Sequence, residues 1–314
     1  MARTRLGQLS LLLMFYSATG LPGVAAKSLE VGQVTLDIQM DQAIAREYDD
    51  QRWNDWLSTS LRAVKSVTGD YPQSELQVQL IAAPGNQTVR FARVRRSSPP
   101  QVHFYVNPDA SRDELLDDWH SYHEFAHLLI PFPGNRDIWF TEGLASYYQY
   151  ILQARAGVID TEEAWRRLLQ GFERGLNDRN GHGQDLRWLS PAMRQQQAYR
   201  RVYWTGAAYF LRVDTRLRTE SNGEHSLDSV LAAFNQCCVD QRRRWNATSL
   251  IDQFGQLSLP HIWQEEYDAS IDQPAEPEFA AALERLGIRQ SALGIRFSNR
   301  PDARALRQAI ASGG

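Results

Sequence analysis

Five consecutive residues, His123-Glu124-Phe125-Ala126-His127, have the types and the spacing of a metal-binding motif. An α-helix has about 3.6 residues per turn, so His123 and His127 lie on one face and can offer imidazole nitrogens to one ion. Glu124 lies about 100° further around the helix, where its carboxylate can take a proton from a water at the metal without being a ligand. The pattern predicts zinc-dependent hydrolysis, although about one chain of this size in a hundred would contain it by chance.

An amphipathic helix is expected to carry the motif. Ser111 can cap the start of this helix, and acidic residues follow in the first turn. Pro131 and Pro133 end the segment. We therefore expect one helix from residue 111 to about residue 130, with the motif in its last turns. Apolar residues recur along it at helical spacing: Leu115, Leu116, Trp119, Tyr122, Ala126 and Leu129.

A third ligand is needed because zinc in a catalytic site usually has three protein ligands and one position open to water. The acidic residues between positions 128 and 159 are Asp137 and Glu142. Asp137 lies in a predicted loop, whereas Glu142 lies at the start of the next predicted helix, so we expect Glu142 to complete the site. The alternative is that Glu142 only interacts with the positive end of the helix dipole.

Residues 139–148 read Trp-Phe-Thr-Glu-Gly-Leu-Ala-Ser-Tyr-Tyr. Together with the histidine motif, they resemble the gluzincin zinc metallopeptidases, most closely the catalytic domain of the glycyl aminopeptidase family. The large zinc aminopeptidases are more distant relatives. The resemblance implies that Glu142 joins His123 and His127 as a ligand of one Zn²⁺, that the substrate is a peptide or protein, and that the fold is thermolysin-like with two lobes.

A third segment, Tyr203-Trp204-Thr205-Gly206, resembles the tyrosine-x-x-glycine helix of those enzymes. The resemblance implies that Tyr203 donates a hydrogen bond to the oxyanion. A phenol suits this role because it stays protonated near neutral pH. The alternative is a tyrosine packed at a helix interface with its hydroxyl bonded to the backbone. Thr205 replaces the lysine that usually precedes the glycine, and the likeness covers roughly residues 111–236.

The related aminopeptidases hold the free amine of the substrate with a glutamate in a glycine-rich strand before the zinc helix. This chain has arginines there, within residues 91–98, and arginines would repel an ammonium group. One hypothesis is that Arg95 or Arg96 meets an acidic or carboxyl-terminal group of the substrate. The alternative is a solvated basic edge strand.

The first 26 residues resemble an export signal. Arg3 and Arg5 precede an apolar stretch over residues 9–16, and Val24-Ala25-Ala26 fits a cleavage site. The alternative is an uncleaved membrane anchor. No later segment has the roughly 20 apolar residues of a membrane span. We therefore expect an exported protein, periplasmic or secreted, without a transmembrane span once the signal is removed.

The composition is that of an ordinary globular protein, with 43% hydrophobic and 23% charged residues. The formal net charge is −3 and basic blocks are missing from the sequence, which argues against a nucleic-acid partner. The fold class expected from the apolar patterns is α+β. Residues 27–135 are expected to form an N-terminal lobe with a small β-sheet and helices, ending in the zinc-binding helix, and residues 136–314 a mainly helical lobe.

The expected strands of the N-terminal lobe are residues 31–38, 75–82, 87–94 and 101–106, and residues 47–67 are an expected helix. In the second lobe, helices are expected over residues 141–156, from residue 161, over 192–219, over 226–236 and, last, over 277–286. Residues 175–190 are expected to be a loop.

The two cysteines, Cys237 and Cys238, are adjacent. Their Cα atoms are held about 3.8 Å apart, below the roughly 4.4–6.8 Å of most disulfides, so a bridge would be strained. We expect two small buried apolar residues instead, and no zinc site, because no further cysteine exists. His120, one turn before His123, is expected to be a neighbour of the metal site rather than a ligand.

The function predicted from these observations is an exported, zinc-dependent metallopeptidase. His123, His127 and Glu142 bind Zn²⁺, Glu124 activates the attacking water, and Tyr203 assists the oxyanion. The alternative is a secreted zinc-binding protein, or an inactive peptidase relative, that recognises peptides without cutting them.

Overall fold

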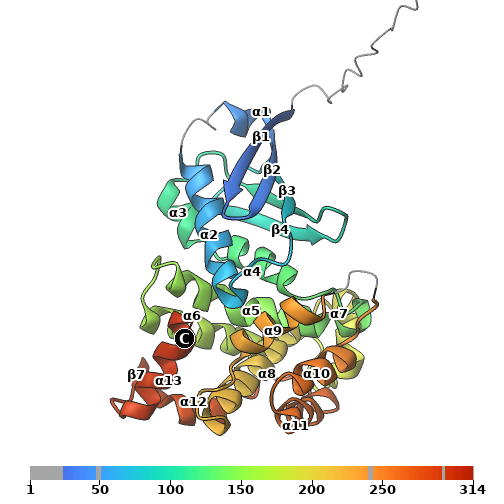
Figure 1. Cartoon of the computed structure of the whole chain (residues 1–314), viewed down its shortest axis with the longest axis vertical. Helices are drawn as coiled ribbons and strands as arrows, with labels where there is room; N and C mark the ends of the chain where they lie inside the picture. The colour runs from blue at the N-terminus through green and yellow to red at the C-terminus, as the bar shows by residue number, and fades with distance from the viewer. Residues whose placement is uncertain (1–23, 47–50, 240–242, 292–293, 314) are drawn as a thin grey trace, which may run out of the picture.

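Strands come mainly from the first third of the chain, and helices make up most of the rest (Figure 1). The computed structural model describes residues 24–46, 51–239, 243–291 and 294–313. The expected α+β fold class is confirmed. The strands are β1 (Val24–Val31), β2 (Val34–Asp41), β3 (Glu75–Ala82), β4 (Val89–Arg95), β5 (Gln101–Val106), β6 (Ile288–Ser291) and β7 (Gly294–Phe297). The helices are α1 (Gln42–Ala45), α2 (Arg52–Thr68), α3 (Arg112–Asp117), α4 (His120–Ala126), α5 (Ile138–Arg155), α6 (Thr161–Leu176), α7 (Leu186–Gln196), α8 (Tyr199–Glu220), α9 (Leu227–Cys237), α10 (Ala247–Gln256), α11 (Pro260–Ile271), α12 (Ala280–Leu286) and α13 (Pro301–Ser312), with the 3-10 turns η1 (His127–Leu129) and η2 (Asn135–Asp137).

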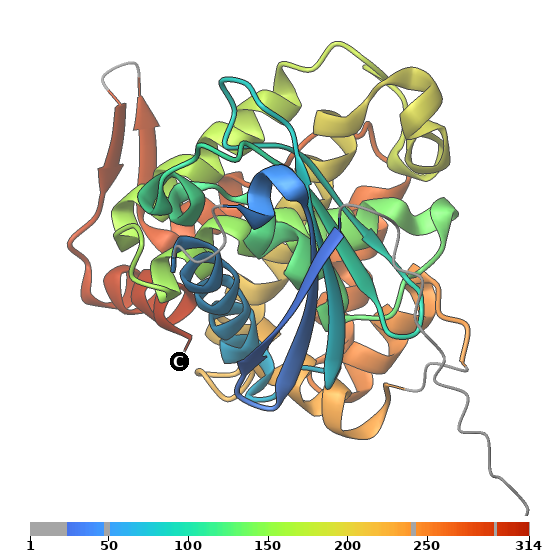
Figure 2. The ribbon, with the colours of Figure 1, turned by 90° about the horizontal axis from the view of Figure 1, so that it is seen from above.

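The five-stranded sheet has the order β1-β2-β3-β5-β4, with β2, β3 and β5 parallel and the two edge strands antiparallel to their neighbours. Every second side chain of β2 is buried, which marks one face as the core face. On that face, Trp56 of α2 packs edge-on against Phe104 of β5, whose ring also contacts Phe125 of α4. Seen from above, α2 runs beside the strands, with the helical body beneath (Figure 2). The motif helix α4 thus lies between the sheet and the helical body, next to edge strand β4.

Helix α5 is the central helix of the helical body, in contact with α4, α6, α8 and α13 among others. Its residues 138–153 are all buried except Glu142. A helix that is apolar on all sides must be surrounded by protein to be stable. Glu142 is the exception because its carboxylate faces the cavity of the candidate site.

Helices α5 and α8 cross at two glycines, Gly143 and Gly206. A Cβ atom on Gly143 would lie 2.5 Å from the Cα atom of Gly206, and one on Gly206 would lie 2.3 Å from the carbonyl oxygen of Trp139. Only glycine at both positions allows the two backbones to approach this closely. Because Glu142 precedes one glycine and Tyr203 lies one turn before the other, the crossing also sets the relative position of these two side chains.

Buried charges join α5, α8 and α9 behind the crossing. The Tyr147 hydroxyl donates to Asp214 at 2.7 Å, and Arg218 pairs with the same carboxylate at 3.0 Å. Arg155 and Arg218 both pair with Asp228, at 2.7 and 3.2 Å. Removing one partner of such a buried pair would leave an uncompensated charge. The network therefore fixes the three helices relative to one another.

Three of the four expected strands occur close to the predicted residues: β3, β4 and β5. The strand expected over residues 31–38 is wrong in detail, because Gly32, at φ +64°, begins a two-residue turn that joins β1 to β2. The expected helix over residues 47–67 corresponds to α2, whose described part starts at Arg52 and ends at Thr68.

The single helix expected over residues 111–130 is wrong, because the chain forms α3 and then α4. Asp118 is extended, with ψ 129°, and its Oδ1 atom accepts a hydrogen bond from the His120 backbone N–H at 2.9 Å. This local bond competes with the continuing helix and starts a new one. The helix expected over residues 192–219 is likewise two helices, α7 and α8, because Gln197 is left-handed at φ +54°. Part of the loop expected over residues 175–190 belongs to α6 and α7. The helix expected from residue 161 is α6, and Asp160 caps it.

The end of the chain also differs from expectation. The helix expected over residues 277–286 begins at Ala280, and it is not the last element, because β6, β7 and α13 follow it. Two helices, α10 and α11, occupy residues 247–271, for which the apolar pattern predicted no definite element.

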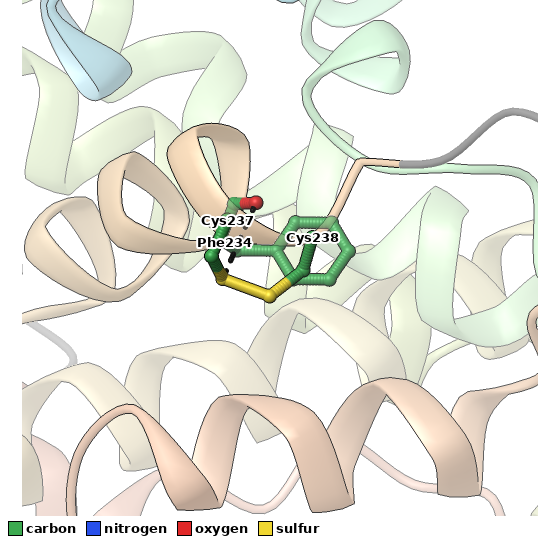
Figure 3. Close-up of a disulfide and its surroundings, with 3 residues drawn as sticks. All are labelled: Phe234, Cys237 and Cys238. Atoms are coloured by element: carbon green, nitrogen blue, oxygen red, sulfur yellow. Dashed lines mark hydrogen bonds between the residues drawn. A yellow bond between two sulfur atoms is a disulfide. The ribbon is translucent and has the colours of Figure 1, made fainter.

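The two cysteines are not the buried apolar pair that was expected. Cys237 and Cys238 form a disulfide (Figure 3). Helix α9 ends at Cys237, and the pair lies at this helix end, with Cys237 exposed and Cys238 half-buried. The apolar contact there is made by Phe234, which is fully buried one turn earlier. The expectation of burial was wrong because it considered only the small size of the cysteine side chain. The position of both cysteines at the end of α9, where the chain leaves the core, determines their exposure.

Most of the expected export signal, residues 1–23, lies outside the described residues. The expected cleavage site, Val24 to Ala26, forms the start of β1, where it pairs with residues 39–41 of β2. Within the described part of the chain, none of the helices combines the length and the apolar character needed to cross a bilayer.

The boundary expected after residue 135 falls at η2, but buried residues on both sides of it form one continuous core.

Candidate active site

The structure brings His123, His127 and Glu142 together. His123 lies in α4, and His127 immediately follows that helix with helical backbone angles, so the spacing of the motif is preserved. The Nε2 atoms of His123 and His127 lie 3.4 and 3.5 Å from the Oε2 atom of Glu142. One donor atom from each residue lies within 4.8 Å of the other two, which allows the three side chains to hold one metal ion.

Two side chains of α5 orient the histidines. Nδ1 of His123 donates to Oε1 of Gln149 at 3.0 Å, and Nδ1 of His127 lies 2.9 Å from the Thr141 hydroxyl, which is able to accept its proton. A proton on Nδ1 would leave the lone pair of each Nε2, which faces Glu142, available to a metal ion. Two imidazoles and a carboxylate beside an open cavity form the donor set of catalytic zinc, so the residues present fit this ion.

Glu142 is suited to be an anionic ligand. Burial alone would raise its pKa, but the adjacent His127 and His123 hold the pKa of Glu142 well below its usual range. Its carboxylate is therefore ionised at neutral pH, although its side chain is only 13% exposed. This result favours the metal-ligand interpretation over a simple interaction with the helix dipole.

Glu124 faces the same cavity from α4 without belonging to the group of three. Burial raises the pKa of Glu124 to about 7, repulsion from Glu142 adds to this, and His123 and Arg96 oppose it. The backbone of Val94 in β4 donates a hydrogen bond to its carboxylate. A carboxylate with a pKa close to ambient pH can both accept and deliver a proton.

Tyr203 reaches the site from α8. Its ring stacks on the imidazole of His123, with 6.1 Å between the ring centres and 22° between the planes. Burial, followed by the negative charges of Glu142 and Glu124, raises the pKa of Tyr203 well above its usual value. The phenol thus stays protonated and remains a hydrogen-bond donor. This placement differs from the alternative in which the hydroxyl bonds to the backbone.

A cavity of about 750 Å³ opens in front of these residues. Edge strand β4 and helix α4 form one side of it, and α5, α7 and α8 form the other. Besides the site residues, its lining includes Arg90, Phe91, Ala92, Arg93, Val94, Arg96, Trp119, His120, Phe132, Asn135, Ile138, Thr141, Met193, Arg194 and Tyr199.

Other residues singled out in the sequence have different partners. His120 lines the cavity, but its Nδ1 atom bonds to Asp118 at 2.8 Å and it does not join the metal-binding group. Asp137 accepts a hydrogen bond from the Ala247 backbone at 3.0 Å, which directs its carboxylate towards α10. Arg96 donates to the carbonyl oxygens of His127 and Ile130. Arg96 therefore holds the end of the motif helix.

Gln149 and Thr141 were not predicted from the sequence. A signal for both was nevertheless present. Thr141 precedes Glu142 directly, and Gln149 follows it by seven residues, two helical turns further along the same face. A polar side chain on an otherwise apolar, buried helix indicates a role at a site. Gln153 shows why this signal is ambiguous, since it is equally buried but donates to the carbonyl oxygens of Leu116 and Asp117.

Comparisons with known proteins agree with this geometry. A family model described as M61 glycyl aminopeptidase matches residues 133–208, a segment that contains Glu142 and Tyr203. A search of curated proteins finds no match. Among solved structures, an aminopeptidase N family protein from Idiomarina loihiensis aligns with a TM-score of 0.63 and 13% identity over 84% of this chain and 49% of that chain. The fold is that of the gluzincin metallopeptidases.

Two further gluzincin-fold structures align over a similar part of the chain. Yeast LTA4 hydrolase aligns with a TM-score of 0.51 and 12% identity, over 83% of this chain and 42% of that chain. An M1 zinc metallopeptidase mutant from Deinococcus radiodurans, bound to a Tyr-Ser-Ala substrate, aligns with a TM-score of 0.50 and 15% identity, over 81% of this chain and 53% of that chain. The chain thus spans about half the length of the structures that it matches. The resemblance to gluzincin metallopeptidases predicted from the motifs is confirmed.

Proposed function

We propose that this chain is an exported zinc metallopeptidase that hydrolyses peptide bonds. The observation that carries the proposal is the convergence of His123, His127 and Glu142 beside an open cavity, with both Nε2 atoms facing the Glu142 carboxylate. The gluzincin fold and the family match over residues 133–208 support it.

Each residue of the site has a part in the proposed reaction. His123, His127 and Glu142 would hold one Zn²⁺. When bound, the ion supplies Lewis acidity, which lowers the pKa of water to about 7 and polarises a carbonyl group. The Glu124 carboxylate would take a proton from the attacking water and deliver it to the leaving nitrogen. The Tyr203 hydroxyl would donate a hydrogen bond to the oxygen that gains negative charge in the transition state.

The test combines metal analysis with product analysis. Purified protein is expected to contain about one zinc per chain and to cleave members of a mixed peptide library, with the cleavage sites identified by mass spectrometry. Treatment with a chelator should abolish cleavage, and added zinc should restore it. Zinc at this ratio without any cleavage would favour the alternative, a zinc-binding protein that recognises peptides without cutting them.

The export part of the proposal rests on the sequence of residues 1–26. Cleavage after Ala26 would remove the first three residues of β1 and leave the rest of its pairing with β2. Expression of the full chain followed by N-terminal sequencing of the extracytoplasmic fraction tests this. Protein that stays in the cytoplasm with an intact N-terminus would contradict it.

A further inference from the structure

Positive charge is concentrated around the candidate active site of a chain that is acidic overall. The formal net charge is −3. The carboxylates that line the cavity are Glu124 and Glu142, and both already belong to the site. A cleft lined by charges of one sign focuses the field and raises the local concentration of oppositely charged ligands. The arginines of this lining are Arg90, Arg93, Arg96 and Arg194.

Of these four arginines, Arg96 is bound to backbone acceptors, the carbonyl oxygens of His127 and Ile130. Within the described residues, Arg90, Arg93 and Arg194 form no ion pair with a carboxylate. Arg93 is the most constrained of the three. It is half-buried in β4, and its Nε atom is buried without a hydrogen-bond partner. The Arg93 guanidinium thus keeps donors that no carboxylate among the described residues uses.

A neighbouring histidine positions the Arg93 side chain. His103 lies opposite Arg93 in the β4–β5 pairing. Its Nε2 atom donates to Oε1 of Gln101 at 3.3 Å, so its Nδ1 atom is left to accept from Nη2 of Arg93 at 3.5 Å. Burial, and then the charges of Arg93 and Arg95, lower the pKa of His103, which keeps the ring neutral and able to accept. His103 therefore orients the arginine without neutralising it.

Apolar side chains occur beside these charges. The large hydrophobic residues with exposed side chains in the described structure are Phe91, Phe132, Leu176, Trp188 and Tyr199. Phe91, Phe132 and Tyr199 line the cavity, at 52%, 39% and 42% exposure. Exposed apolar groups around a cavity mark a binding surface. A ligand that fits this lining has both an anionic group and apolar surface.

We propose that the cavity selects peptides that carry a carboxylate next to apolar residues, with Arg93 from β4 and Arg194 from α7 as the residues that bind this carboxylate. The proposal rests on the proposed peptidase function and names its substrate class. A guanidinium presents a planar pair of donors that matches the two oxygens of a carboxylate, so a charged group is favoured over the neutral amide of the same shape. The carboxylate is either an acidic side chain or the C-terminus of the peptide.

Binding is measured first, so that the test does not depend on turnover. The zinc-loaded Glu124→Gln variant is titrated with fluorescently labelled peptides of alanine and phenylalanine that contain one glutamate or one glutamine at each position in turn. Each peptide is made with a free and with an amidated C-terminus. The expected result is that at least one carboxylate-bearing peptide binds about tenfold more tightly than its amide counterpart. The glutamate series identifies a side-chain carboxylate, and the free-acid series identifies the C-terminus.

Arginine variants then locate the preference. In the same background, Arg93→Gln and Arg194→Gln are each expected to reduce the tenfold preference to about twofold or less. Arg95→Gln is the matched control, because Arg95 is an exposed arginine two residues further along β4 that does not line the cavity. This control is expected to keep the full preference. Equal binding of all acid and amide pairs, or equal loss in the Arg95→Gln variant, would overturn the proposal.

The same peptides separate this proposal from the proposed function. The chain with Glu124 intact is incubated with them, and kcat/KM is compared within each pair. Cleavage of acid and amide peptides at equal rates would overturn the carboxylate preference and leave the peptidase intact. A binding preference that depends on Arg93, without cleavage of any peptide, would support the preference and contradict the peptidase function.

Discussion

Each of the two motif histidines depends on one side chain of a neighbouring helix. His123 donates to Gln149, and His127 is hydrogen-bonded to the hydroxyl of Thr141, both in α5. Without these acceptors, the proton could move to Nε2 or the ring could turn, and the free lone pair would no longer face Glu142. The metal-binding capacity of the histidines is therefore a property of the pair of helices rather than of the motif alone.

We expect Gln149→Leu to lower zinc affinity by about 10- to 100-fold, because the change removes the acceptor that fixes His123. Competition against a fluorescent zinc chelator measures the affinity. The control is Gln153→Leu, which alters an equally buried glutamine of α5 that bonds to Leu116 and Asp117 instead of a histidine. Equal losses of zinc affinity in the two variants would show that the effect is one of general destabilisation.

Glu124→Gln is expected to retain zinc and to lose hydrolysis by about a thousandfold, because the amide cannot accept the proton. His127→Ala is expected to lose both zinc and activity, because it removes a ligand. Metal content by mass spectrometry and cleavage of a library peptide distinguish the two. Full activity in the Glu124→Gln variant would remove this residue from the role of base.

Tyr203→Phe is expected to lower kcat by about a hundredfold while zinc affinity stays within a factor of two or three, because the lost hydroxyl serves only the transition state. Tyr199→Phe is the control. Tyr199 packs edge-on against Tyr203 and lines the same cavity, but it is exposed at the rim. If kcat is unchanged in the Tyr203→Phe variant, the tyrosine has only the packing role that was the alternative.

At the scale of elements, the α5–α8 crossing decides where Glu142 and Tyr203 lie. Gly206→Ala would place a methyl group 2.3 Å from the carbonyl oxygen of Trp139, so the helices must separate. We expect a loss of about 3 kcal/mol in the free energy of unfolding, the upper part of the range for overpacked cores, because the contact is with backbone that cannot turn away. Zinc affinity should fall as well, since Glu142 precedes the glycine on the other side of the crossing. Denaturant unfolding and zinc titration measure both, and a stability equal to that of the unmodified chain would contradict the close approach.

Local sequence patterns correctly predicted the strands whose residues alternate between apolar and polar and are flanked by turn residues. β3 and β5 occur at the predicted residues because alternation and flanking turn residues mark them. The break between α3 and α4 was missed, because the apolar spacing continues through Asp118 and only the capping bond to His120 reveals it. The disulfide was missed for a related reason: composition does not indicate whether a helix end lies in the core or at the surface. At the site, types and spacing predicted that His123, His127 and Glu142 lie together, as they do, whereas Gln149 required knowledge of which helix packs on α4.

At the scale of the whole molecule, the proposed metal ligands come from both parts of the fold. His123 and His127 belong to the layer under the sheet, and Glu142 belongs to the central helix of the helical body. The core is continuous between these parts, so they are already packed together through apolar contacts. A bound ion would add a further link between them, and its binding free energy would contribute to the stability of the whole fold.

We therefore expect zinc to raise the midpoint of thermal unfolding. Zinc at about 100 times its dissociation constant stabilises the folded state by about 2.7 kcal/mol. For a chain of 314 residues, that corresponds to a rise of roughly 4 °C in Tm. Scanning calorimetry with excess chelator and with excess zinc measures the difference. His127→Ala should show no such rise, because it lacks a ligand, whereas Glu124→Gln should respond like the unmodified chain, because Glu124 lies beside the metal site without belonging to it. A rise of equal size in the His127→Ala variant would place the ion elsewhere in the molecule.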